Sequence, residues 1–158
     1  KSNQHAVKLH RLLQLSQGIP AMSITTALQQ QHRHCDEFLA QAESTARAAQ
    51  WDDCVNATQV FCQMTEAHFA LEEESLFPAF EQATGMSSGP TQVMRSEHAQ
   101  ARDLMQGLQD AAQNRDADDF IGCAETLLIL LQQHNMKEEN ILYPMCDRSI
   151  PEFAERLA

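Results

Sequence analysis

Apolar side chains recur at steps of three and four residues in four segments of the chain, the spacing of one face of an α-helix. Polar, glycine- or proline-containing stretches near residues 51–53, 85–90 and 113–116 separate these segments. We therefore expect four helices, each burying one face in a bundle. In chain order, the positions expected on the buried faces are Leu28, His32, Cys35, Leu39 and Ala42; Thr58, Phe61, Thr65, His68, Glu72 and Ser75; Met94, His98, Ala101, Met105 and Leu108; and Phe120, Ala124, Leu127, Leu131, His134, Glu138, Ile141 and Met145.

Candidate caps mark where three of these helices begin. Ser23 is a suitable N-cap for the first helix, and Asp52 and Asp53 can cap the second. Pro90 follows the turn-forming residues 87–89 and is placed to begin the third helix.

Two prolines are expected to interrupt the second and fourth helices. Pro78 and Pro144 lack the backbone donor that a helix interior requires. We therefore expect a helix break at both positions. The residue pairs that precede the prolines, 76–77 and 142–143, should form a hydrophobic plug over that end of the bundle.

The 158 residues suffice for one domain with its own core. The expected fold class is all-α, with the helical bundle formed by residues 21–158. Residues 1–20 form a short N-terminal arm with enough leucines for an amphipathic helix, which Gly18 and Pro20 end.

A repeat of 66 residues runs through the bundle segment. Residues 63–78 and 130–144 share the pattern His-x-x-x-Glu-Glu-x-x-hydrophobic-aromatic-Pro, and the same offset carries His32 onto His98. Residues four apart lie on one face of a helix, so each repeat presents a histidine and a glutamate to the same side. The chain is therefore a duplicated helix pair, and each copy carries one His and then one His-x-x-x-Glu.

The four repeated histidines should lie at one depth in the bundle. His32 lies 19 residues before Trp51 and His68 lies 17 after it, or about 28 and 25 Å along antiparallel helices at 1.5 Å per residue. His98 and His134 lie 17 before and 19 after Arg115, which gives the same agreement.

This arrangement indicates a metal site. A single buried histidine is usually a hydrogen-bonded core residue, and a run of glutamates is usually a solvated face. Buried carboxylates, however, are costly unless they are paired or bound to metal. We therefore predict six metal ligands, which are His32, His68, Glu72, His98, His134 and Glu138.

Composition narrows the choice of partners and compartment. A formal charge of −11 disfavours nucleic acid and anionic membrane surfaces but favours cations. The chain has no apolar run long enough to span a membrane and no secretory pattern after Lys1. Five scattered cysteines fit reduced thiols of a cytoplasmic protein.

Over residues 23–145 the chain resembles the hemerythrin-like (HHE cation-binding) family, on the order His, His-x-x-x-Glu, His, His-x-x-x-Glu and the trailing hydrophobic-aromatic-Pro. The resemblance implies an up-down-up-down antiparallel four-helix bundle around a non-haem di-iron centre. It also implies two iron ions joined by an oxo or hydroxo bridge. The carboxylates of Glu72 and Glu138 would bridge the same two ions. Manganese or zinc could substitute for the iron.

The resemblance implies a protein that binds or reacts with oxygen, nitric oxide or peroxide, in sensing, detoxification or repair of iron centres. Oxygen-carrying members have a fifth histidine one turn from the third, whereas this chain has Met94 and Arg102 on either side of His98. A purely reversible carrier is therefore disfavoured. The alternative is a metal-stabilised bundle that serves as a protein-interaction or iron-sensing module. The sequence assigns neither an enzymatic reaction nor a protein partner.

Some neighbours of the predicted ligands receive other roles. His34 lies off the buried face and is expected to be exposed. Glu73 and Glu139 lie on the flank and should be solvated or contact the ligands. Tyr143 is expected to pack rather than take part in chemistry, and Cys62 to be a core thiol.

Overall fold

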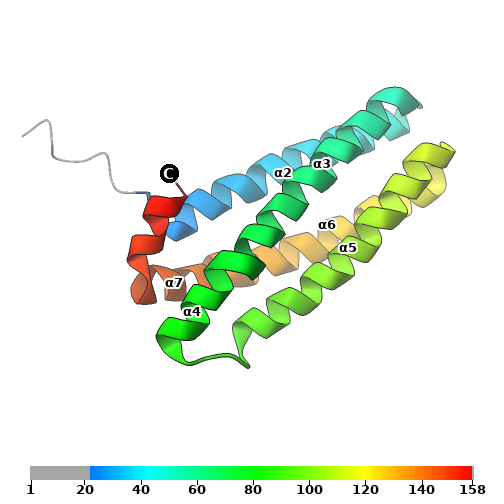
Figure 1. The fold of residues 1–158 in the computed structure, drawn as a ribbon. Helices are drawn as coiled ribbons and strands as arrows, with labels where there is room; N and C mark the ends of the chain where they lie inside the picture. The colour runs from blue at the N-terminus through cyan, green and yellow to red at the C-terminus, as the bar shows by residue number, and fades with distance from the viewer. Residues whose placement is uncertain (1–21, 158) are drawn as a thin grey trace, which may run out of the picture.

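The computed structural model describes residues 22–157, so the expected N-terminal arm lies outside the described residues. Four long helices lie side by side in Figure 1: α2 (Ile24–Arg47), α3 (Trp51–Leu71), α5 (Pro90–Asn114) and α6 (Ala117–Lys137). Helix α2 packs on α3 and α6, and α5 packs on the same two helices. The all-α fold is confirmed.

Shorter elements gather at one end of the bundle. They are the π-helical turns η1 (Glu72–Leu76) and η2 (Glu138–Leu142), the helices α4 (Phe77–Thr84) and α7 (Tyr143–Ser149), and the 3₁₀ helix η3 (Pro151–Arg156). Asp147 joins α7 to the start of α2, since its Oδ1 accepts a hydrogen bond from the backbone N–H of Ile24 at 2.8 Å.

Helix starts follow the sequence signals in part. The Ser23 side chain accepts a hydrogen bond from the Thr26 N–H and caps α2, and Pro90 begins α5. The expected caps Asp52 and Asp53 instead lie inside the first turn of α3. Negative charge there is favourable because the N-terminus of a helix carries partial positive charge.

The predicted helix breaks at Pro78 and Pro144 are wrong. The chain stays helical through both prolines because a π-turn precedes each one: the Phe77 N–H donates to the Glu72 carbonyl and the Tyr143 N–H to the Glu138 carbonyl. These i→i−5 bonds widen the helix. Proline has no backbone N–H and cannot make the usual i→i−4 hydrogen bond. The loss falls in a turn where the backbone hydrogen bonds have already shifted from i−4 to i−5.

Each π-turn shifts the buried face by one residue. Ile141, expected on the buried face, is 57% exposed, whereas Leu142 is buried. In the second helix, Leu76 is buried where Ser75 was expected. An inserted residue rotates all later side chains by about 100°, since an α-helix has 3.6 residues per turn.

Two apolar clusters flank the histidine layer. One cluster, which includes Phe61, Phe69 and Leu127, fills the bundle toward the α2–α3 and α5–α6 turns. The other contains the expected plug residues, which are Leu76, Phe77, Leu142 and Tyr143. The polar layer therefore lies inside the core rather than at its edge.

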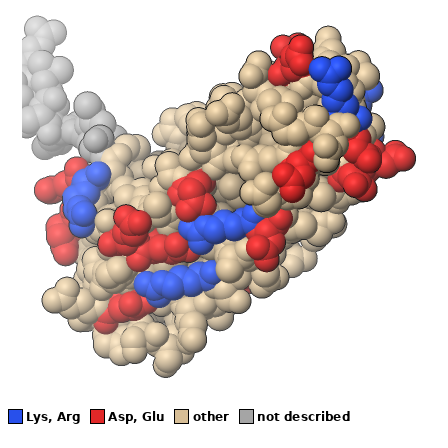
Figure 2. Space-filling model, turned by 45° about the vertical axis from the view of Figure 1, so that its right-hand side comes forward, with Lys and Arg blue, Asp and Glu red and all other residues tan. Residues whose placement is uncertain are grey.

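The described part of the surface is charged and its helices are amphipathic. Acidic side chains flank basic ones on the face drawn in Figure 2. In residues 22–157, no helix has the length and apolar character needed to cross a membrane. The five cysteines, all within this part of the chain, form no disulfide.

Candidate metal centre

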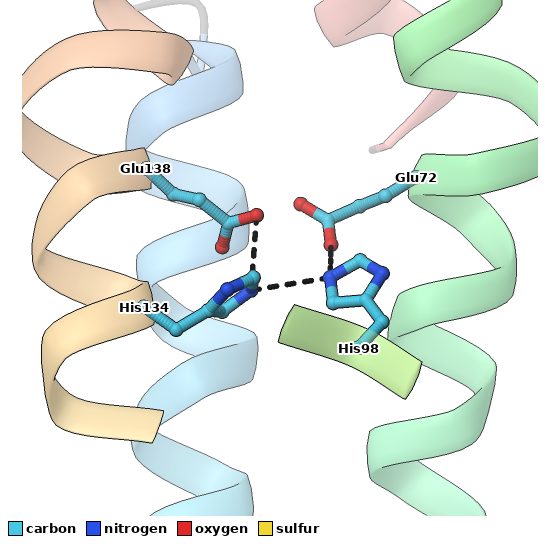
Figure 3. A group of neighbouring side chains, drawn as sticks. All are labelled: Glu72, His98, His134 and Glu138. Atoms are coloured by element: carbon cyan, nitrogen blue, oxygen red, sulfur yellow. Dashed lines mark hydrogen bonds and ion pairs between the residues drawn. The ribbon is translucent and has the colours of Figure 1, made fainter. Parts of the chain in front are cut away.

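Six side chains from the four helices and the two π-turns meet in the middle of the bundle. All six predicted ligands are at most 4% exposed, and both glutamates are fully buried. Figure 3 shows four of them, with Glu72 and His98 facing His134 and Glu138. The structure therefore brings together the residues that the repeat singled out.

The histidines meet in pairs through their Nε2 atoms. His32 Nε2 lies 2.9 Å from His68 Nε2, and His98 Nε2 lies 3.1 Å from His134 Nε2. The carboxylates lie against these pairs. Glu72 Oε2 is 3.3 Å from His98 Nε2, and Glu138 Oε1 is 3.2 Å from His134 Nε2.

Each outer ring nitrogen faces an oxygen acceptor. Two of them face glutamates of the π-turns: His32 Nδ1 is 2.7 Å from Glu139 Oε1, and His98 Nδ1 is 2.8 Å from Glu73 Oε1. The flank glutamates thus contact the ligands, one of the two roles expected for them.

The other two histidines are held by residues of α2 and α5. His68 Nδ1 lies 2.8 Å from Gln31 Oε1, and His134 Nδ1 lies 2.9 Å from Glu97 Oε2. A neutral imidazole that donates from Nδ1 has a lone pair on Nε2. With the proton at Nδ1 in all four histidines, four such lone pairs would converge on the centre, the arrangement found where histidines bind metal.

Two carboxylate oxygens support the fit to a cation. Glu72 Oε2 and Glu138 Oε1 are buried and have no hydrogen-bond partner. Unpaired buried acceptors are costly, and facing lone pairs repel each other, so the cluster needs positive charge between its donor atoms. Two sets of donor atoms are close enough to hold an ion: Glu72, His98, His134 and Glu138; and His32, His68 and Glu138.

Burial and neighbouring charges perturb the ionisation of the cluster. Burial and the repulsion of Glu138 raise the pKa of Glu72 to about 7. Burial and the nearby His32 lower the pKa of His68 to about 3. At His134 burial opposes protonation, but the nearby carboxylates of Glu138, Glu97 and Glu72 together outweigh it and raise the pKa to about 9. A bound cation would replace the protons that otherwise hold these groups together.

Basic side chains hold the outer carboxylates from the surface. Arg102 donates to Glu73 at 2.9 Å and to Glu66 at 2.8 Å. Lys137 pairs with Glu97. Glu73 and Glu97 therefore each lie between a buried histidine and a basic residue.

Tyr143 is the residue whose position differs most from expectation. It packs in the core, as predicted, but its hydroxyl also enters the metal layer, where it donates to Glu72 Oε1 at 2.6 Å and lies 2.8 Å from Glu138 Oε2. Burial and these carboxylates raise the pKa of its phenol well above the ordinary value. The π-turn η2 causes the difference, because a residue five positions after Glu138 returns to the same face.

The repeat in the sequence also marks two residues that contact the Nδ1 atoms of the histidines. Gln31 and Glu97 are separated by the same 66 residues as His32 and His98. The repeat could therefore have identified both as partners of histidines. His34, by contrast, is exposed as expected, and Cys62 is a buried core residue.

Comparison with known proteins identifies the family. A family model described as the hemerythrin HHE cation binding domain matches residues 23–146. No curated protein matches the chain significantly. No solved structure matches it significantly either.

Proposed function

The chain belongs to the hemerythrin HHE cation-binding domain family, and we propose that its buried layer binds two iron ions that react with oxygen, nitric oxide or peroxide. The observation that carries this proposal is the convergence of four Nε2 atoms on two carboxylates that each have an unpartnered oxygen. Imidazole and carboxylate ligands together suit iron or manganese.

Each ion would have its own histidine pair. One ion would be held by His98, His134 and Glu72, and the other by His32 and His68, while Glu138 lies within reach of both. The expected bridging role therefore has geometric support at Glu138. At Glu72, the oxygen not facing His98 accepts the Tyr143 hydrogen bond.

The surroundings favour a small ligand. The six donor side chains are almost completely buried. An open surface pocket of about 520 Å³ between α3 and α5 is lined by residues such as Ala67, Ala70 and Met105, and by none of the six. Bound iron would supply exchangeable coordination positions and could change its oxidation state by one electron. The protein would supply the ligands, exclude bulk water and hold the histidine protons at Nδ1.

The neighbours of His98 add no further ligand. Met94 is buried in the apolar end cluster, and the Arg102 guanidinium is bound by Glu66 and Glu73. Two histidines per iron leave more exchangeable positions than a five-histidine set. We therefore expect that removal of oxygen will not simply reverse oxidation.

Reactivity of the loaded protein tests the proposal. Protein loaded with ferrous iron without oxygen should bind two ions per chain and change its visible spectrum on exposure to oxygen or nitric oxide. Evacuation should not restore the reduced spectrum after oxygen. Zinc-loaded protein, which cannot change redox state, is the control and should show no change. Two bound irons that react with neither gas would favour a structural metal and contradict the proposed reactivity.

A further inference from the structure

Tyr143 breaks the symmetry of the repeated site. Its counterpart in the first repeat is Phe77. The two rings occupy equivalent places: Phe77 stacks on His98 with centroids 5.9 Å apart, and Tyr143 stacks on His32 at 5.7 Å. The two positions thus differ in a single hydroxyl group.

That hydroxyl lies among the donor atoms of the second ion, the one expected at His32, His68 and Glu138. Tyr143 Oη is 3.1 Å from His32 Nε2, 3.4 Å from His68 Nε2 and 2.8 Å from Glu138 Oε2. His32 Nε2 is in turn 2.9 Å from His68 Nε2 and 3.3 Å from Glu138 Oε2. Ligands bound at about 2.0–2.2 Å are separated by roughly 2.8–3.6 Å in octahedral or tetrahedral geometry. Five of the six distances between these four atoms therefore match the spacing of neighbouring ligands in one coordination shell.

The single proton of the Tyr143 phenol does not account for both of its short contacts with carboxylates. A phenol has one proton, and Tyr143 Oη approaches two carboxylate oxygens at 2.6 and 2.8 Å. It can donate to only one of them at a time. The other close oxygen pair requires a further proton or a cation.

We propose that the hydroxyl oxygen of Tyr143 is the fourth protein ligand of the ion held by His32, His68 and Glu138. This inference rests on the proposed metal function of the same site. On binding, the phenol O–H bond breaks and a metal–oxygen bond forms, and the proton leaves to solvent. No electrons are transferred. A bound cation stabilises the deprotonated ligand, as it does for thiols and water.

The two ions then have unequal surroundings. The ion at His98 and His134 has two histidines and two carboxylates, whereas the other has two histidines, one carboxylate and a phenolate. A hard anionic oxygen favours the more highly charged metal ion. The position at His32 and His68 should therefore be the one at which ferric iron is held more tightly.

The chain offers a direct reporter, because Tyr143 is its only tyrosine. Zinc titration of the metal-free protein should produce the ultraviolet difference spectrum of one tyrosinate as the second ion binds. In ferric protein the phenolate should add a visible charge-transfer band. Tyr143→Phe should abolish both signals and weaken the second ion about tenfold or more. Thr65→Val is the matched control and should keep both signals. It also removes a buried hydroxyl, but the Thr65 hydroxyl has no hydrogen-bond partner.

The outcomes separate this inference from the function on which it rests. Two bound zinc ions with an unchanged tyrosine spectrum would overturn the ligand role of Tyr143 and leave the metal site intact. Failure of the protein to bind any of the tested metals would overturn both. The wild-type spectrum decides the matter even if Tyr143→Phe folds poorly.

Discussion

At the scale of single residues, Glu138 contacts the two histidine pairs with different oxygens, whereas Glu72 contacts both with one, Oε2. Glu138 Oε1 lies 3.2 Å from His134 Nε2, and Glu138 Oε2 lies 3.3 Å from His32 Nε2. The neighbouring histidines hold the pKa of Glu138 well below the ordinary value despite its burial. Each oxygen of Glu138 therefore contacts a different histidine pair.

Removal of Glu138 should affect both ions. Glu138→Ala should reduce binding from two ions to at most one, because each ion loses a ligand. Glu139→Ala should keep two ions but weaken binding by about 10- to 100-fold, because it removes only the acceptor that orients His32. Equilibrium dialysis followed by metal analysis measures both effects. Glu74→Ala, a change at an exposed neighbour in the other repeat, is the control, and equal losses in all three variants would contradict the assigned roles.

Most of the predicted ligands could be identified from sequence because helix period and repeat act together. The position of His68 four residues before Glu72 fixes their common face, and the offset to His134 and Glu138 repeats the pattern. The role of the Tyr143 hydroxyl could not be found in this way. It depends on a π-turn, and a calculation that assumes an ideal α-helix places that side chain on the wrong face.

At the scale of elements, the two π-turns set the orientation of the end cluster. Glu72 and Glu138 each begin a π-turn, and the buried residues that follow are displaced by one position. π-turns inside α-helices often occur at functional sites. Here they let the predicted ligand glutamate and the residue five positions later face the same centre.

Removal of one residue should test the effect of the second π-turn. Deletion of Asn140, which is exposed in η2, should close the turn to an α-helix and rotate Leu142, Tyr143 and Cys146 by about 100°. We expect a loss of several kcal/mol in stability, because large side chains leave the core. Thermal unfolding measures this, and Asn140→Ala is the control of unchanged length. Equal stability of the two variants would show that the turn does not determine the packing.

A charge contact joins α4 to α5 across the turn between them. Glu81 accepts hydrogen bonds from Arg95 and from Thr91. The hydrogen bond from Arg95 is the main reason why the pKa of Glu81 lies below its ordinary value. The contact therefore stabilises the fold above the ordinary carboxyl pKa and is lost as pH falls through the lowered value.

Glu81→Gln should reveal this pH dependence. At pH 7 the variant should lose about 0.5 kcal/mol of unfolding free energy, a typical value for a partly exposed ion pair. The difference from wild type should shrink as pH falls through the lowered pKa of Glu81, because Glu81 then becomes neutral as well. Urea unfolding across this range tests it, with Glu37→Gln at an exposed position as control. A difference that persists at low pH would contradict the charge argument.

At the scale of the whole molecule, a polar layer divides the core in two. Apolar clusters lie on both sides of it. The layer holds two carboxylates and four imidazoles where a small bundle would ordinarily place apolar side chains. Metal binding should therefore contribute to folding as well as to function.

Metal removal should lower the stability of the entire bundle. At a free metal concentration 100 times the Kd, each bound ion adds about 2.7 kcal/mol. That corresponds to a Tm higher by about 5–10 °C for a chain of this size. A chelator should remove this increment from wild type and from His34→Ala, but it should have a smaller effect on His134→Ala, because that variant weakens the ion expected at His98 and His134. An equal chelator effect on His134→Ala would place the metal elsewhere.

X-ray absorption at the iron edge tests most directly whether the layer holds two ions. The account predicts only nitrogen and oxygen neighbours around each iron, with a second iron at about 3–4 Å, the spacing typical of dinuclear sites. Iron without a second iron at that distance, or iron with sulfur neighbours from the cysteines, would contradict it.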